Sequence, residues 1–329
     1  MSQFDSLALR YQDGKVFLLD QTLLPHEERW LEASLVTTMI EAIKLLRVRG
    51  APLIGVAAAF ALGSLSRKGA KADEIRAAGR ALREARPTAV NLAGAVDRCL
   101  KALDSDEDIE ALALKIAEED VELCQKIARF GAPLVPDGRC VMTICNAGGL
   151  ATAGMGTAVG VLLQAWAEGK RFEVVVPETR PLGQGARLTT WELSRAGIPF
   201  TLICDNMVGY AMCEKRVAFA VVGADRIARN GDFANKIGTY NMAILAKYHG
   251  VPFYTAAPYT TFDLDCVSGS EIPIELRHSD EVRGTYALRG CEALNPAFDV
   301  TPASLVSGWI TDKGLVREAG RLFPKCNLD

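Results

Sequence analysis

The stretch of residues 221–239 reads VVGADRIARNGDFANKIGT, and it decides how the second half of the chain folds. Its apolar run ends at Asp225, and the chain then continues through Lys236 toward a helical pattern. A second apolar run, which begins at Arg139, ends in the same way at Cys145 and a glycine-rich turn. Short apolar runs that end at polar residues before a helix are typical of buried strands in a parallel sheet.

Strands and helices alternate from about residue 129 onward. The expected strands span 139–144, 172–176, 199–203, 217–222 and 251–256. Strands separated by helices imply right-handed βαβ crossovers, so we expect a doubly wound parallel sheet. In such sheets ligands bind beyond the carboxyl ends of the strands, where the strand order reverses. Four polar residues follow expected strand ends, and one cleft would collect them: Cys145, Glu178, Asp205 and Asp225.

The first 128 residues have a different pattern. Residues 7–20 alternate around Asp13-Gly14, which is the strongest short signal for a β-hairpin. Helical periodicity follows at 31–48, 52–67, 71–85, 90–103 and 107–130. We therefore predict an α/β protein with an N-terminal hairpin plus helical domain, 1–128, followed by the parallel-sheet domain, 129–329.

The composition favours an intracellular globular protein. The chain has 329 residues, 49% of them hydrophobic, which is enough for the cores of two domains. A formal charge of −3, with Lys and Arg spread along the chain, argues against nucleic-acid binding. The nine cysteines form no CxxC pair and no signal peptide is evident, so we expect reduced thiols and a cytoplasmic location. The three histidines lack zinc-ligand spacing, and no apolar run is long enough to span a membrane.

Cys145 and Asp225 are the candidate catalytic residues. We expect a helix to begin near Ala151, and a thiol close to a helix N-terminus has a lowered pKa because of the helix dipole. The alternative is that Cys145 is a small buried residue. Asp225 is a candidate general acid or base, and the alternative is an N-cap or an ion-pair partner of Arg226.

Several groups are candidates for binding a phosphorylated sugar. The side chains of Asn235 and Lys236, with the free main-chain amides just beyond them, are suited to hold phosphate. The segment Arg49-Gly50-Ala51-Pro52 joins two helices, and its proline, arginine and first-turn amides suit an anion in the same way. Residues 86–91, which begin with Arg86, have a similar construction.

Gln184 lies in a polar loop, 178–187, after an expected strand. Its amide is able both to donate and to accept hydrogen bonds, which suits sugar hydroxyls. The alternative for this loop is a structural salt bridge from Glu178 to Arg180 or Arg187. Together with an acid that moves a proton, these groups predict an enzyme that acts on a phosphorylated sugar.

The glycines of 154–160, GMGTAVG, suggest a dinucleotide-binding loop as another alternative. The spacing is GxGxxxG, however, and the pattern would begin well inside the expected helix instead of at the strand-to-helix turn. We therefore expect these small residues to allow close packing of the helix on the sheet, and we predict no nicotinamide cofactor.

The chain resembles the 5-methylthioribose-1-phosphate isomerase family in a series of motifs that occur in the same order from residue 49 to residue 302. They are RGAP, RPTAVN, CNAGGLATAG, ETRPLGQGARLT, ICDNM, GADRIARNGDFANKIGT, AAPYTTFD, IPIE and NPAFDVTP. The wider family includes ribose-1,5-bisphosphate isomerases and the regulatory subunits of the translation initiation factor 2B exchange factor. The resemblance implies a helical domain, a Rossmann-like domain, a homodimer, no cofactor and a role in methionine salvage.

The resemblance also implies roles for individual residues. Cys145 and Asp225 would be the catalytic pair. The substrate would be held by Arg49, Gly50, Ala51, Arg86, Gln184, Asn235 and Lys236. Asp225 would protonate the ring oxygen while hydrogen moves between C2 and C1, through either an enol phosphate or a hydride shift; Cys145 would be the base in the first route and a stabilising group in the second.

Five positions depart from the family pattern next to these motifs: Gly149, Met155, Pro177, Gly183 and Leu276. They leave the catalytic and phosphate-holding groups intact, so the departures bear on the pocket for the sugar's C5 substituent. A 5-deoxyribose-1-phosphate isomerase is therefore the second expectation. A non-catalytic regulatory subunit and a ribose-1,5-bisphosphate isomerase, which needs further cations at C5, are the remaining alternatives.

Overall fold

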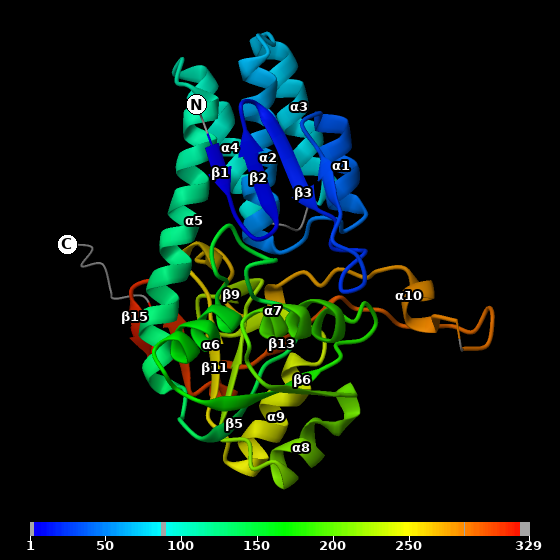
Figure 1. The fold of residues 1–329 in the computed structure, drawn as a ribbon, viewed down its shortest axis with the longest axis vertical. Helices are drawn as coiled ribbons and strands as arrows, with labels where there is room; N and C mark the ends of the chain where they lie inside the picture. The colour runs from blue at the N-terminus through cyan, green and yellow to red at the C-terminus, as the bar shows by residue number, and fades with distance from the viewer. Residues whose placement is uncertain (1–2, 87–89, 286, 323–329) are drawn as a thin grey trace. The chain divides into compact units, whose positions relative to one another are not determined.

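The computed structural model describes residues 3–86, 90–285 and 287–322 (Figure 1). The chain divides into two compact units. Unit 1 comprises Met1–Gln125 and Ala147–Gly156, and unit 2 comprises Lys126–Asn146 and Thr157–Asp329. The division of the chain into independent domains at residues 128 and 129 stays a prediction.

Unit 1 begins with an antiparallel sheet in the order β1 (Gln3–Asp5), β2 (Leu9–Gln12), β3 (Lys15–Leu19), β4 (Trp30–Glu32). The predicted hairpin is confirmed: Gln12 pairs with Lys15 across Asp13-Gly14, whose φ angles are 49° and 82°. The predicted start of a helix at residue 31 is wrong. Trp30–Glu32 pairs with β3 instead, because this long-range pairing overrides the local helical periodicity.

The helices of unit 1 otherwise follow the prediction within a few residues. They are α1 (Val36–Lys44), α2 (Ala51–Arg67), α3 (Ala72–Ala85), α4 (Val90–Asp104) and α5 (Ile109–Gly131), whose residues from Lys126 onward belong to unit 2. Helix α2 is buried throughout 53–64 and contacts α1, α3, α4 and β3. Its small residues permit this, since a Cβ at Gly55 would lie 2.8 Å from the carbonyl oxygen of Asn91 in α4.

The described residues of unit 2 form a seven-stranded sheet in the order β15-β14-β11-β8-β5-β6-β7. These strands are β5 (Arg139–Met142), β6 (Phe172–Pro177), β7 (Phe200–Ile203), β8 (Phe219–Val222), β11 (Phe253–Ala256), β14 (Gly308–Thr311) and β15 (Gly314–Val316). Neighbouring strands are parallel except at β15, which is antiparallel. The predicted α/β fold class with a doubly wound sheet is confirmed.

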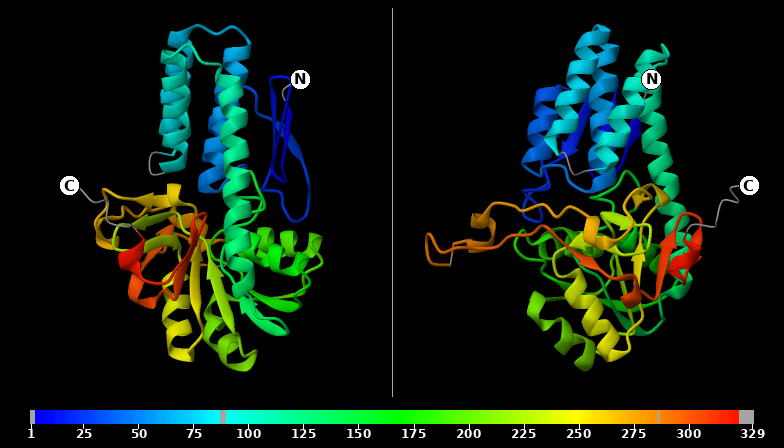
Figure 2. Two further views of the ribbon diagram at one scale, coloured as in Figure 1. Left: turned by 90° about the vertical axis from the view of Figure 1, so that its left-hand side faces the viewer. Right: turned by 180° about the vertical axis from the view of Figure 1, so that it is seen from behind.

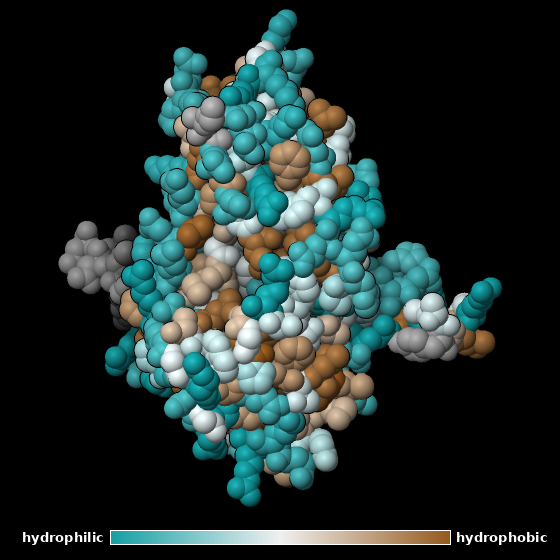
Figure 3. Space-filling model, viewed as in Figure 1, coloured by the Kyte–Doolittle hydropathy of each residue, from teal (hydrophilic) through white to brown (hydrophobic). Residues whose placement is uncertain are grey.

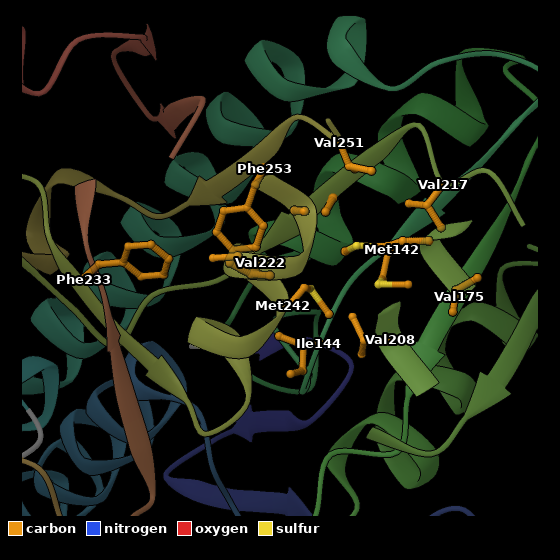
Figure 4. Close-up of a cluster of buried hydrophobic side chains, with 14 of the residues drawn as sticks. Met142, Ile144, Val175, Val208, Val217, Val222, Phe233, Met242, Val251 and Phe253 are labelled. Carbon is orange, nitrogen blue, oxygen red and sulfur yellow. The ribbon is translucent and has the colours of Figure 1, made fainter. Parts of the chain in front are cut away.

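Helices connect these strands and bury both faces of the sheet (Figure 2). They are α6 (Ala158–Ala167), α7 (Thr190–Arg195), α8 (Val208–Glu214) and α9 (Thr239–His249). Met142, Val175, Val222 and Phe253 pack with α8 and α9 in one apolar cluster (Figure 4). Strand residues one position away point to the opposite face because of the pleat.

A second, smaller sheet in unit 2 has the order β12 (Phe262–Asp263), β9 (Arg226–Ala228), β10 (Phe233–Lys236), β13 (Phe298–Thr301). The sequence pattern did not predict it, because its strands are only two to four residues long. Strands β9 and β10 form a hairpin, and β13 adds antiparallel to β10. Residues 221–239 thus contribute the end of β8 to the large sheet and β9 and β10 to the small one.

Apolar side chains fill the interior of each unit, and the largest buried ones include Phe60 and Trp309. On the face shown in Figure 3, hydrophilic side chains are interspersed with hydrophobic ones. A short helix, α10 (Ser279–Arg283), lies in the segment between the strands β12 and β13. Among the residues described, no helix has both the length and the apolar character needed to span a membrane.

Candidate active site

The strand order of the large sheet reverses between β5 and β8. From β5 the chain moves outward to β6 and β7, and it then returns to β8 on the other side of β5 and continues to β11. The two strands are parallel, with Met142 opposite Ala220. Met142 ends β5 and Val222 ends β8, so Cys145 and Asp225 each lie three residues beyond a strand end. Both therefore lie at the carboxyl edge of the sheet, at its topological switch point.

Cys145 is buried, with 8% of its surface exposed, and its backbone is in the left-handed region at φ 60°. Its main-chain NH donates to Thr179 Oγ1 at 2.9 Å, and its carbonyl accepts a hydrogen bond from the hydroxyl of Thr189. The expected helix near Ala151 is wrong, since α6 begins at Ala158. In the residue ranges that the structure describes, no helix therefore begins directly beside the Cys145 thiol, and its surroundings are set by other groups.

The geometry of the loop after Cys145 explains why this loop is rich in glycine. Gly148 and Gly156 form an isolated β-bridge, and a Cβ at Gly156 would lie 2.3 Å from the Cα of Gly148. Gly154 and Gly156 precede α6, so the prediction that this pattern begins inside the helix is wrong. The glycines permit close approach of two backbone segments.

Asp225 is half-buried and is held by the hairpin of β9 and β10. Its main-chain NH donates to the carbonyl of Ala234 at 2.9 Å. Its neighbour Arg226 forms an ion pair with Asp263, with Nη1 and Oδ2 3.0 Å apart. Asp225 is thus fixed to the strand that carries Asn235 and Lys236, with its backbone position set by main-chain pairing.

Asn235 and Lys236 are the last two residues of β10. Asn235 is buried, and its Nδ2 donates to Thr239 Oγ1 at 2.9 Å. Lys236 Nζ donates to the carbonyl of Ala297 at 3.0 Å and lies 4.5 Å from the centre of the Phe298 ring. These contacts fix the direction of both side chains within the small sheet.

Three of the main-chain amides after Lys236 donate hydrogen bonds within the protein itself. Gly238 and Tyr240 donate their NH groups to the carboxylate of Asp299 at 2.7 and 3.0 Å, and Ile237 donates to the carbonyl of Ala297 at 3.1 Å. Burial raises the pKa of Asp299 to about 6 despite these hydrogen bonds. The prediction that these three amides are free to hold a phosphate is therefore wrong.

Gln184 directly precedes a single π-helical turn, Gly185–Thr189, in the loop after β6. It is 5% exposed, and its Oε1 has no hydrogen-bond partner among the residues that the structure describes. A buried acceptor without a partner costs about 1–3 kcal/mol. Such an oxygen is suited to accept a hydrogen bond from a ligand hydroxyl.

The other predicted binding residues lie in unit 1. Gly50 has φ 92°, and a Cβ on it would lie 2.4 Å from the carbonyl oxygen of Ala151. Ala51 is the first residue of α2. Arg49 and Arg86 are half-buried, and Arg86 is the C-cap of α3. The rest of the predicted RPTAVN junction, at 87–89, falls outside the described residues.

Sequence reasoning missed the side chains that hold Cys145 and its neighbour. Thr179 and Thr189 contact Cys145 directly, and Asn146 Nδ2 donates to the buried carboxylate of Glu192 at 2.7 Å. The signal for the threonines was their place in the ETRPLGQGARLT block. Within the described part of the chain, no group of three or more His, Cys, Asp or Glu side chains is arranged to hold a metal ion.

Two curated proteins similar to this chain have the same name. A methylthioribose-1-phosphate isomerase of Citrobacter koseri is 50% identical over 327 residues, covering 96% of both chains. One from Yersinia enterocolitica is 51% identical over 320 residues, covering 94% of this chain and 92% of its own.

Two solved structures with the same fold have different names. The crystal structure of 5-methylthioribose 1-phosphate isomerase from Pyrococcus horikoshii OT3 matches with a TM-score of 0.88 and 40% identity, over 95% of this chain and 92% of that one. The structure of translation initiation factor eIF-2B, subunit delta, from A. fulgidus matches with a TM-score of 0.85 and 41% identity, over 97% and 98%. The model of the Initiation factor 2 subunit family matches residues 47–318, and this chain belongs to that family.

Proposed function

We propose that this protein is a methylthioribose-1-phosphate isomerase, which converts 5-methylthioribose 1-phosphate to 5-methylthioribulose 1-phosphate in methionine salvage. Relatives of that name are about half identical to it over nearly the whole chain. The observation that carries the chemistry is the placement of Cys145 and Asp225 beyond adjacent parallel strands at the switch point of the sheet. A thiol and a carboxyl at one sheet edge are suited to transfer protons within one sugar.

The reaction rearranges hydrogen without any net gain or loss of atoms. The bond between C1 and the ring oxygen breaks, and that oxygen takes a proton, which Asp225 supplies. The hydrogen on C2 is transferred to C1, and the hydroxyl on C2 gives its proton to the Asp225 carboxylate as the ketone forms, which restores the acid. In one route Cys145 removes the C2 proton and an enol phosphate forms; in the other, hydride moves from C2 to C1 and Cys145 stabilises the cationic species.

Some of the proposed binding residues are assigned to the phosphate of the substrate, and others are assigned to its hydroxyl groups. Lys236 and the two arginines, Arg49 and Arg86, supply positive charge for the phosphate. Gly50 and Ala51, at the start of α2, complete the proposed set of substrate-binding residues. Gln184 accepts from a sugar hydroxyl through its unpartnered oxygen, and Asn235 adds a second amide.

The substrate is tested by incubating the purified protein with 5-methylthioribose 1-phosphate and following formation of the ketose. Parallel reactions with 5-deoxyribose 1-phosphate and ribose 1,5-bisphosphate test the alternatives at C5. We expect the highest kcat/KM with the methylthio sugar. The two 5-substituents differ by a contact worth about 1–3 kcal/mol, so the deoxy sugar should be about 5- to 150-fold poorer. Turnover of none of the three sugars would exclude the proposed activity.

The 5-deoxyribose 1-phosphate alternative depends on the five departures from the family pattern. Gly149 is packed against Leu7, with 3.1 Å between its ideal Cβ position and Leu7 Cδ2, and Leu276 is 70% exposed. Higher kcat/KM with the deoxy sugar would transfer the assignment to that substrate and leave the reaction type unchanged.

A regulatory-subunit role has one observation in its favour, the similarity to the structure named eIF-2B subunit delta. The presence of Cys145 and Asp225 favours catalysis instead. We also propose a homodimer and a cytoplasmic location. Light scattering of the purified protein should give twice the chain mass of 35.4 kDa. Isolation of a stable hetero-oligomer from cell extract would favour the regulatory role.

A further inference from the structure

We propose that Thr179 and Thr189 are positioning residues that hold Cys145 in a strained backbone conformation, and that Asp205 anchors Thr179. This inference rests on the proposed function, in which Cys145 acts on the sugar. All four residues lie in unit 2, in segments that follow the strands β5, β6 and β7.

Two linked residues carry backbone strain. Cys145 has φ 60° and Thr179 has φ 63°, and neither is a glycine. A β-branched residue in the left-handed region is an outlier that persists only where its surroundings enforce it. Thr179 is 1% exposed, so its strain is held in the interior. The Cys145 NH donates to the Thr179 hydroxyl at 2.9 Å, so the two strained residues hold each other.

Both main-chain groups of Cys145 are bonded to threonine hydroxyls from one loop. Its NH donates to Thr179, and its carbonyl accepts from Thr189, whose side chain is fully buried. The Thr179 hydroxyl in turn donates to the carbonyl of Pro177 at 3.1 Å. Because the NH and the carbonyl of Cys145 are both held, these two hydroxyls set the direction of its side chain.

The backbone geometry of the loop that contains the two threonines permits their contact with Cys145. Thr189 ends the π-helical turn Gly185–Thr189, and π-turns occur often at functional sites. Gly185 is required there, because a Cβ would lie 1.9 Å from the carbonyl oxygen of Pro177 and 2.9 Å from Thr179 Oγ1. The close approach lets both ends of the loop reach Cys145.

Asp205 holds the other side of Thr179. Its Oδ1 accepts from the Thr179 NH and its Oδ2 accepts from the Arg180 NH, each at 2.7 Å. The carboxylate therefore accepts hydrogen bonds from the amides on both sides of the strained residue Thr179. Asp205 follows the end of β7, so three neighbouring strand ends contribute to the position of the thiol.

The test compares Thr179→Val, Thr179→Ser and Asp205→Asn with the wild-type protein. Loss of a buried hydrogen bond should lower kcat about 5- to 150-fold in Thr179→Val, with KM within about threefold. Thr179→Ser keeps the hydroxyl and should retain kcat within about threefold. Asp205→Asn loses one acceptor and should lower kcat about 5- to 10-fold. Thr190→Val is the matched control, because its hydroxyl bonds the Ala186 carbonyl within its own turn, and its kcat should stay unchanged.

A crystal structure of Thr179→Val tests the positioning role independently of the proposed activity. We expect φ of Cys145 to leave the left-handed region. If Thr179→Val does not fold, the structure and kcat of Asp205→Asn provide the same comparison. Unchanged φ at Cys145 together with unchanged kcat would overturn the inference, as would an equal fall in kcat for Thr190→Val. A wild-type protein without turnover would instead overturn the proposed function, while the change in φ would still test the positioning role.

Discussion

The loops after β5 and β8 hold the two proposed catalytic residues by different means. Cys145 is strained, and side chains from another segment bond both of its main-chain groups. Asp225 is outside the left-handed region, and its NH pairs with the carbonyl of Ala234 in the hairpin that it begins. Main-chain pairing tolerates side-chain changes, whereas side-chain anchors do not. The position of Cys145 should therefore be the more sensitive of the two to mutation.

We expect the largest loss of activity when either proposed catalytic side chain is replaced. Cys145→Ser and Asp225→Asn should each lower kcat by about 10²- to 10⁴-fold, the range for loss of a general acid or base. Substrate affinity measured by calorimetry should change little, because neither residue is assigned to the phosphate. Near-normal kcat in both variants would show that neither side chain takes part in the reaction.

The side-chain anchoring of the loop after Cys145 extends to Asp120 of α5. Asp120 is buried, and its carboxylate accepts hydrogen bonds from the NH groups of Ala153 and Gly154, the first at 2.6 Å. Burial nevertheless raises the pKa of Asp120 to about 6 from an ordinary value of 3.8.

The folded state therefore binds the Asp120 proton more tightly than the unfolded state does. The resulting stabilisation is fully present below about pH 4 and is lost as the pH rises to about 6, with a total change of about 3 kcal/mol. Asp120→Asn cannot titrate, so urea unfolding from pH 4 to pH 7 should show a flatter profile than the wild type. Parallel profiles for the two proteins would contradict this account of the loop.

Lys236 tests the phosphate side of the hairpin that holds Asp225. Lys236→Met keeps a chain of similar length and removes the charge. We expect KM to rise about 10- to 150-fold, since a hydrogen bond to a charged group is worth about 1.5–3 kcal/mol, with a smaller change in kcat. An unchanged KM would show that the phosphate binds elsewhere. Lys247→Met, in the last turn of α9, is the control.

The smallest effect is expected in the turn of the same hairpin. Asn230 is exposed, and its side chain bonds Asp232, with Nδ2 and Oδ2 2.8 Å apart. Because main-chain pairing holds Asp225, Asn230→Ala should change kcat by less than about twofold and the free energy of unfolding by about 0.5–1.5 kcal/mol. A fall in kcat as large as that of Thr179→Val would show that both loops depend on side-chain anchors.

The main helices and strands could be predicted from the sequence because they depend on composition and on the periodicity of apolar residues. The strands that end shortly before Cys145 and Asp225, the hairpin at Asp13-Gly14 and the helices of unit 1 all follow from apolar runs, turn residues and helical spacing. The strand at Trp30–Glu32 was missed because its partner, β3, overrides the local pattern.

The local geometry of the site required coordinates. Left-handed backbone at Cys145 and Thr179 has no sequence signal, since neither residue is a glycine. The capture of the Gly238 and Tyr240 amides by Asp299 depends on a strand, β13, that pairs with β10 from some sixty positions away in the chain. Short strands of this kind leave little periodicity to recognise.

A crystal structure of the protein with the bound ketose phosphate tests the central claim most directly. We predict Cys145 Sγ and a carboxylate oxygen of Asp225 within about 4 Å of the sugar, with the thiol at C1 or C2 and the acid at the former ring oxygen, distances that permit proton transfer. A sugar that contacts neither side chain, or only one of them, would contradict the assignment of these two residues as a catalytic pair.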